Sequence, residues 1–158
     1  MTIKKHSGIF TLKAEQFLPI PLEQAWEFFS TPKNLAKITP DFMGFNITSE
    51  LADKMFPGQI ITYKIGLFPG IKGSWVTEIT HVNEPHFFVD EQRFGPYAMW
   101  HHEHHFKAHE NGTLMEDKVS YKLPLGSFGA LFHSILVKPK LQQIFNHRKV
   151  TLEKLFPA

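Results

Sequence analysis

The sequence predicts an α+β domain in which an antiparallel sheet of about seven strands packs against one long C-terminal helix. Three observations lead to this prediction. Apolar and polar residues alternate over residues 10–18, turn signals divide residues 42–123 into pieces of strand length, and residues 127–156 carry a broad apolar face with helical spacing. Strands and helices that are segregated along the chain are typical of α+β proteins.

Length and composition favour one ordinary globular domain. The chain has 158 residues, 42% of them hydrophobic and 20% charged, and we expect a single domain with its core over about residues 9–156. It has no cysteine, which excludes a disulfide framework, a thiolate metal site and a cysteine nucleophile. The formal net charge is +2, with basic and acidic residues intermixed, so we expect no nucleic-acid partner. The sequence lacks an apolar stretch of about 18 to 20 residues, so we expect no membrane insertion and a cytoplasmic location.

Two short helices are expected after the first strand. Pro19 and Pro21 end the strand, and Pro21 suits the first position of a helix. Apolar residues then follow with helical spacing at Leu22, Ala25, Trp26 and Phe29. Thr31, as the N-cap, and Pro32 repeat this pattern for a second short helix that ends near residue 40.

A meander of about six strands is expected over residues 42–123, because turn signals recur there without helical periodicity. The pair Asn111-Gly112 is a strong hairpin signal. A two-residue turn at this pair places His104 opposite Val119 and His102 opposite Tyr121.

The last segment, residues 127–156, is expected to form a long helix. Pro139 lies inside it and cannot donate a hydrogen bond to the carbonyl of Ile135. We therefore predict a kink or a break at this position.

The order of elements, and several short segments, resemble the START-like (helix-grip) domains of the SRPBCC superfamily, which includes polyketide cyclases and the birch-pollen allergen group. The segments are Phe17-Leu18-Pro19-Ile20-Pro21, Trp26-Glu27-Phe28-Phe29, Asn34-Leu35, Ile38-Thr39-Pro40, Gly95-Pro96-Tyr97 and Trp100-His101-His102-Glu103-His104-His105-Phe106, followed by Gly112-Thr113 and Asp117. The resemblance spans residues 10–156, and the last of the long segments is similar to a bacterial stand-alone branch of ligand-binding proteins; similar domains are fused to sugar-nucleotide epimerase-like proteins. It implies a curved sheet wrapped around the long helix, with a cavity between them.

Polar residues interrupt the inward face of the predicted hairpin. Alternation places Trp100, His102, His104 and Phe106 on one face of their strand. Asp117 and Tyr121 share the apolar face of the next strand, which the hairpin register puts on the same side. Asp90 and Gln92 of the preceding strand join them if that strand turns the same face inward.

Three interpretations of these polar residues stay open. They form a satisfied buried network, they orient the polar end of a ligand, or they carry catalysis or a metal. A His-Asp pair can act as a general base. For zinc, only His102 and His104 share a face, and a third ligand has to come from Asp117 or Asp90. We expect no metal and no cofactor.

The function expected from the sequence is non-catalytic binding of a small hydrophobic or amphipathic molecule in the cavity. The polar end is assigned to His102, His104, Asp117 and Tyr121, with Asp90 and Gln92, and the apolar walls to Trp75, Trp100, Phe106, Phe128, Phe132 and Leu136. The first alternative is a cyclase or hydrolase acting on a polyketide-like or cyclic substrate, with His104 and Asp117 as base and Tyr121 as donor. The second is a protein-interaction module like the co-chaperone domains of the same fold; a homodimer or a fusion-type partner also stays open.

Overall fold

The computed structural model describes residues 1–68, 71–126, 129 and 132–157. Its helical elements are α1 (Leu22–Phe29), η1 (Pro32–Asn34), α2 (Leu35–Ile38), η2 (Asp41–Met43), η3 (His133–Val137) and α4 (Lys138–Leu155). Its strands are β1 (Thr2–His6), β2 (Ile9–Leu18), β3 (Asn46–Ile47), β4 (Gln59–Phe68), β5 (Ile71–Asn83), β6 (Phe87–Phe94), β7 (Met99–His109) and β8 (Gly112–Lys122). No helix among the described residues is long and apolar enough to cross a membrane.

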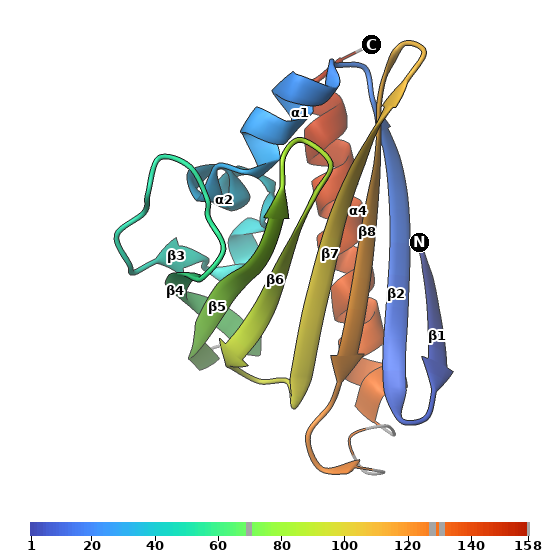
Figure 1. Cartoon of the computed structure of the whole chain (residues 1–158). Helices are drawn as coiled ribbons and strands as arrows, with labels where there is room; N and C mark the ends of the chain where they lie inside the picture. Colours follow the sequence, from blue (N-terminus) through green and yellow to red (C-terminus); the bar gives the residue numbers. More distant parts are fainter. Residues whose placement is uncertain (69–70, 127–128, 130–131, 158) are drawn as a thin grey trace.

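All eight strands form one antiparallel sheet in the order β1-β2-β8-β7-β6-β5-β4-β3. The pairing of β2 with β8 joins the two ends of the chain's strand-rich region. Figure 1 shows α4 running along one face of the twisted, curved sheet, with α1 and α2 beside the upper part of α4. The α+β class and the helix-grip arrangement predicted from the sequence are confirmed.

The sheet has one strand more than predicted. Six strands were expected over residues 42–123 and six are present there, but β1 adds an eighth strand that pairs with β2. This edge strand is almost wholly exposed and includes Lys4, Lys5 and His6. Because it buries little, it lacks the alternation that identifies a strand in sequence.

The predicted hairpin register is wrong by two residues. His104 pairs with Asp117 and His102 with Val119, and the turn consists of residues 110–111. Gly112 belongs to β8 instead, where a Cβ atom would lie 2.2 Å from the carbonyl oxygen of Leu18. Close approach of β2, rather than turn conformation, therefore requires this glycine. A shift of two residues preserves the face on which each side chain lies.

The C-terminal helix is interrupted next to Pro139, as predicted. The interruption is a π-helical turn over His133–Val137, and Pro139 occupies the first turn of α4. A π-helical turn is a common site at which a helix accommodates an irregular hydrogen-bond pattern. The predicted start of the helix at residues 127–128 lies outside the described residues.

Buried apolar side chains of the described residues form three clusters along the sheet. The first joins α1 to β6, β7 and α4 and includes Trp26, Phe29, Phe88, Phe106 and Leu152. The second lies on β4 and β5 and includes Ile61, Tyr63, Trp75 and Ile79. The third joins β2, β8 and α4 and includes Phe10, Leu12, Val119, Tyr121 and Leu141. Inward-facing side chains of one strand therefore belong to different clusters, according to their position along the sheet.

Candidate ligand-binding site

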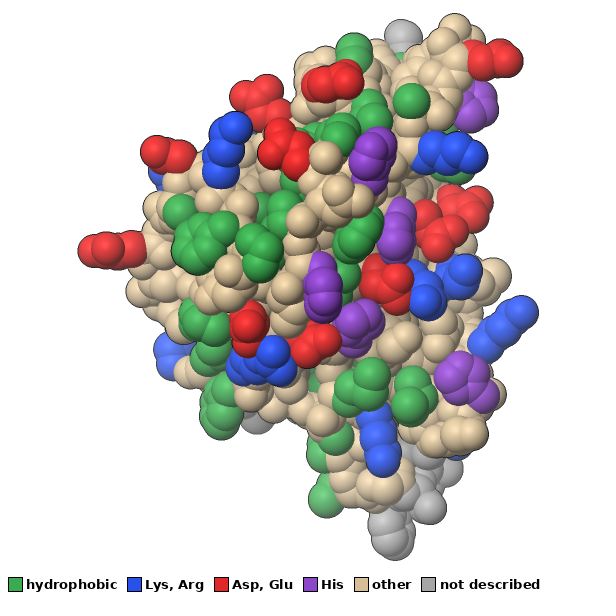
Figure 2. Space-filling model, in the orientation of Figure 1, with side chains coloured by type: hydrophobic (Ala, Val, Ile, Leu, Met, Phe, Trp, Pro, Cys, Tyr) green, Lys and Arg blue, Asp and Glu red, His purple; other side chains and the backbone are tan. Residues whose placement is uncertain are grey.

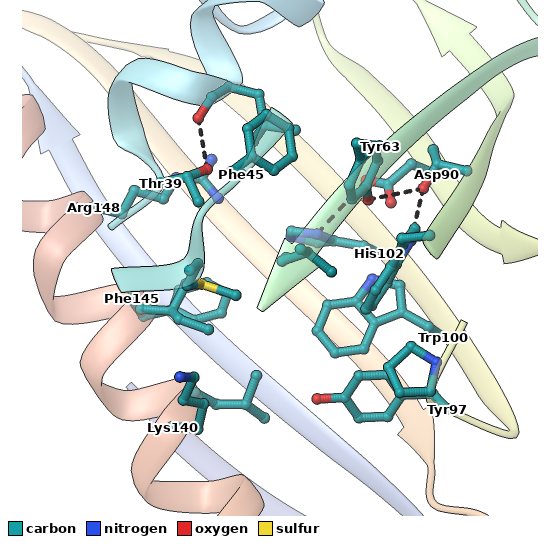
Figure 3. Close-up of a pocket in the computed structure, with 18 of the residues that line it drawn as sticks. Thr39, Phe45, Tyr63, Asp90, Tyr97, Trp100, His102, Lys140, Phe145 and Arg148 are labelled. Carbon is teal, nitrogen blue, oxygen red and sulfur yellow. Dashed lines mark hydrogen bonds and ion pairs between the residues drawn. The ribbon is translucent and has the colours of Figure 1, made fainter. Parts of the chain in front are cut away.

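A cavity of about 640 Å³ lies between the sheet and the C-terminal helix. In Figure 3, Phe145 and Arg148 of α4 face Trp100 and His102 of β7 across it. Its volume falls within the range of about 300–1,000 Å³ that is usual for small-molecule sites. Most lining side chains are apolar or aromatic, including Phe45, Ile61, Tyr63, Ile65, Ile79, Tyr97, Leu141 and Ile144.

Seven of the twelve predicted site residues line this cavity: Trp75, Asp90, Trp100, His102, His104, Phe132 and Leu136. The rings of Trp75 and Trp100 meet edge to face with centroids 5.5 Å apart, and Tyr97 lies 4.7 Å from Trp100. Three large rings from β5, β7 and the loop before β7 thus form one aromatic wall. Phe128 lies outside the described residues.

Five residues form a polar cluster beside this wall: Asp90, His102, His104, Asp117 and Arg148. His102 Nε2 donates to Asp117 Oδ1 over 2.8 Å, and His104 Nε2 donates to Asp90 Oδ2 over the same distance. Arg148 Nη1 donates to Asp117 Oδ1 over 3.1 Å. All five except Asp117 line the cavity, so Asp117 supports the cluster from behind.

The two histidine rings of the polar cluster lie in contact. Their centroids are 3.7 Å apart with the ring planes tilted by 33°, and the ring of Phe88 stacks on His104 at 4.1 Å. Nδ1 of His104 lies 3.1 Å from Asp117 Oδ1, yet it has no hydrogen-bond partner among the described residues. The orientation of both rings is therefore set by packing and by the two aspartates together.

Burial and charge act against each other on the pKa values of the polar cluster. Burial raises the pKa of Asp117, but the charge of Arg148 and hydrogen bonds from the histidines outweigh it and hold this pKa well below its ordinary value. Burial likewise raises the pKa of Asp90, and the hydrogen bond from His104 with the charges of both histidines lowers it overall.

The two histidines shift in opposite directions. Burial lowers the pKa of His104, but the polar contacts and negative charges of Asp117 and Asp90 leave it above the ordinary value. Burial and the charge of His104 lower the pKa of His102, and Asp117 only partly offsets them. The polar cluster therefore accepts one proton readily, and a second proton is unfavourable.

Arg148 is the main residue that the sequence interpretation missed. It is buried against Phe29, with its guanidinium carbon 5.3 Å from the ring centroid. Leu141, Ile144, Phe145, Arg148 and Leu152 follow one another with helical spacing on α4. A charged residue inside this apolar stripe was the available signal, because a buried charge requires a partner.

Three further predicted site residues do not line the cavity. The hydroxyl of Tyr121 is hydrogen-bonded to Nε2 of His133 over 2.7 Å, within the third core cluster, so its predicted place at the polar end is wrong. Phe106 packs in the first core cluster and does not line the cavity. Gln92 Nε2 donates to the carbonyl of Tyr97 over 2.7 Å, and its Oε1 accepts from the amide of Tyr97 over 3.1 Å. It therefore fixes the loop that carries Tyr97.

The sequence matches no protein-family model and no curated protein. Solved structures share its fold. A protein from Arthrobacter aurescens gives a TM-score of 0.71 at 12% identity, over 97% of this chain and 91% of that one. A protein from Chromobacterium violaceum gives 0.70 at 14% identity, over 94% and 97%. A nucleoside-diphosphate sugar epimerase from Corynebacterium glutamicum gives 0.64 at 24% identity, over 90% of this chain but 28% of that one. These likenesses establish the fold alone.

Proposed function

We propose that the chain binds one small, mainly apolar molecule that carries a polar group, in the cavity between the sheet and α4. The observation that carries this proposal is a cavity of about 640 Å³ with a mainly apolar wall to which four polar-cluster residues contribute. A mostly apolar pocket with a few convergent polar groups is the usual design of a small-molecule site. Membership of the START-like SRPBCC superfamily, in a ligand-binding branch, and a cytoplasmic location are part of the same proposal.

The shape and chemistry of the wall suit a flat or cyclic apolar body. Trp75 of β5, Trp100 of β7 and Tyr97 of the loop before β7 offer rings to it, and Phe145 offers another from α4. At the polar end, the guanidinium of Arg148 supplies a donor, and the carboxylate of Asp90 supplies an acceptor. A hydroxyl, carbonyl or carboxylate on the ligand would find partners there.

A fluorescence titration with 8-anilino-1-naphthalenesulfonate, an apolar probe with one anionic group, tests this proposal. Ile144→Trp places a larger side chain in the cavity, while Val150→Trp puts the same side chain on the exposed face of α4. We expect Ile144→Trp to weaken probe binding about tenfold or more, because it occupies the space of the ligand. The Val150→Trp variant should bind like the wild type. Equal probe affinity in both variants would contradict binding of the probe in the cavity.

The enzymatic alternative, expected with His104 and Asp117 as the base, is carried better by the buried His102–Asp117 pair with its 2.8 Å hydrogen bond, because His104 Nε2 is paired with Asp90. Such a pair can serve as a general base for a cyclase or hydrolase. Tyr121 is not available as the proton donor, because its hydroxyl is hydrogen-bonded to His133. Turnover of a candidate cyclic ester that is lost in His102→Gln, with ligand binding retained, would favour this alternative.

A further inference from the structure

We propose that Asp90, His102 and His104 bind one divalent transition-metal ion at the cavity wall. The three ligand atoms all lie within 4.8 Å of one another. Nδ1 of His102 lies 3.6 Å from Asp90 Oδ2, and Nε2 of His104 lies 2.8 Å from the same oxygen. The dashed contact between His102 and Asp90 in Figure 3 marks one edge of this triangle.

These separations match the edges of a metal coordination shell. Ligands at about 2.0–2.1 Å from a metal are about 2.9 Å apart at a right angle and about 3.4 Å apart at the tetrahedral angle. The observed 2.8 and 3.6 Å, the two edges at Asp90, lie close to these two values. The third edge, between the two ring nitrogens, is at most 4.8 Å, so the rings close on the ion by rotating toward each other where this edge exceeds about 4.2 Å.

The far nitrogens of both rings face a single carboxylate, which is the arrangement that orients metal-binding histidines. Asp117 Oδ1 lies 2.8 Å from Nε2 of His102 and 3.1 Å from Nδ1 of His104, while Arg148 holds the same oxygen. Metal-bound histidines nearly always give their other N–H to a carboxylate, carbonyl or water. Asp117 is positioned to take this role for two ligands at once.

The metal-bound state also fixes the position of the proton on a buried ring nitrogen. Nδ1 of His104 is buried and has no hydrogen-bond partner among the described residues. When Nε2 of His104 coordinates a metal, the neutral ring carries its proton on Nδ1, which then points toward the carboxylate of Asp117.

Two imidazoles and one carboxylate suit Zn²⁺, Fe²⁺, Co²⁺ or Ni²⁺ and disfavour Mg²⁺ and Ca²⁺, which prefer oxygen ligands. Asp90, His102 and His104 all line the cavity, so the remaining coordination positions face its interior. They would take water or an oxygen atom of the bound molecule. This inference goes beyond ligand binding, since the three side chains can hold a metal whether or not an organic molecule is present.

Cobalt(II) added to the full chain after treatment with EDTA provides the test, because its visible absorption reports the coordination geometry. We expect one Co²⁺ per chain and displacement of this Co²⁺ by Zn²⁺. Asp90→Asn should weaken Co²⁺ binding about 100-fold or more by removing the charged ligand, and Asp117→Asn should weaken it by about 10- to 100-fold. Circular dichroism of each variant checks the fold.

The matched control uses histidines of the same strand that face outward. His101 and His105 pair with Glu91 and Glu103 at 2.7 and 3.0 Å on the outer face, where Figure 2 shows histidine and acidic side chains side by side. His101→Ala/His105→Ala should keep the full Co²⁺ stoichiometry and spectrum. If this double variant loses the metal, or if folded Asp90→Asn keeps wild-type affinity, the proposal is wrong. A wild-type chain that binds no Co²⁺ would also overturn it, without bearing on the binding of the apolar probe.

Discussion

Replacing Arg148 by methionine should destabilise the chain by about 3 kcal/mol. The side chains of Arg148 and Asp117 are only 11% and 7% exposed, and their charged atoms lie 3.1 Å apart. Removing one partner of a buried ion pair costs about 3–5 kcal/mol, because the other charge stays buried. The lower end applies here, since Asp117 keeps its contacts with both histidines.

The loss should depend on pH with a definite sign. The charge of Arg148 is the largest influence that lowers the pKa of Asp117. A carboxyl group with a lowered pKa stabilises the folded state above its ordinary pKa, near about pH 4, and this contribution disappears as the pH falls through the folded-state value. The difference between wild type and Arg148→Met should therefore be largest near neutral pH and shrink in acid.

Urea unfolding followed by tryptophan fluorescence measures these free energies, because all three tryptophans are partly or wholly buried. Lys149→Met is the matched control: its side chain is 58% exposed and its contact with Glu153 is 3.9 Å, so the change should be within about 0.5 kcal/mol. Adding Asp117→Asn to Arg148→Met should restore at least about 1 kcal/mol, since the stranded charge is removed. If Arg148→Met costs no more than Lys149→Met, the buried pair is not what holds the polar cluster together.

Three further predictions test the sheet, the revised role of Tyr121 and the histidine pair. Gly112→Ala should cost at least about 2 kcal/mol in urea unfolding, because its Cβ would meet the β2 carbonyl at 2.2 Å; a neutral result would refute the close strand approach. Tyr121→Phe should cost about 0.5–1.5 kcal/mol through the lost hydrogen bond with His133, and should leave probe affinity unchanged; weakened probe binding would return the residue to the site. The metal-free chain should be most stable near about pH 6.5. As the pH falls toward about 6.5, His104 binds its proton in the folded state before it does so in the unfolded state, so the free energy of unfolding rises. Below about pH 6.5, His102 binds its proton in the unfolded state first, so the free energy of unfolding falls again. A steady trend from pH 8 to 5 would contradict the opposite pKa shifts.

Strand alternation correctly placed His102 and His104 inside, because the choice of face depends only on a period of two. The register was wrong because Asn111-Gly112 carries the hairpin signal in sequence, while the actual constraint on Gly112 is the approach of Leu18 from β2. That contact is between strands far apart in the chain, and no local pattern reveals it.

The errors at Tyr121 and Phe106 have a common physical cause. Alternation tells which face of a sheet a side chain occupies, but not which part of a long curved face it reaches. Phe106 reaches the first core cluster near α1, and Tyr121 reaches the third beside β2. Only the strand order and curvature, which depend on the whole chain, separate these positions from the cavity wall.

Arg148 shows a different limit. The helix was predicted from the apolar residues of α4, and Arg148, the charged residue on the same buried stripe, was not included among the site residues. Its partner Asp117 lies on β8, 31 residues away, so the pairing follows from the packing of helix on sheet. A charge on a buried face indicates that a partner exists, but the sequence alone does not identify it.

The central claim is that the cavity holds one small molecule. Native mass spectrometry of the freshly purified chain, with excess 8-anilino-1-naphthalenesulfonate added, tests this most directly, because it registers either a molecule carried through purification or the probe. We expect one small-molecule occupant per chain in the wild type and in Val150→Trp, and a clearly lower occupancy in Ile144→Trp, where the added side chain takes up part of the cavity. An unoccupied wild type, or equal occupancy in Ile144→Trp, would contradict the claim.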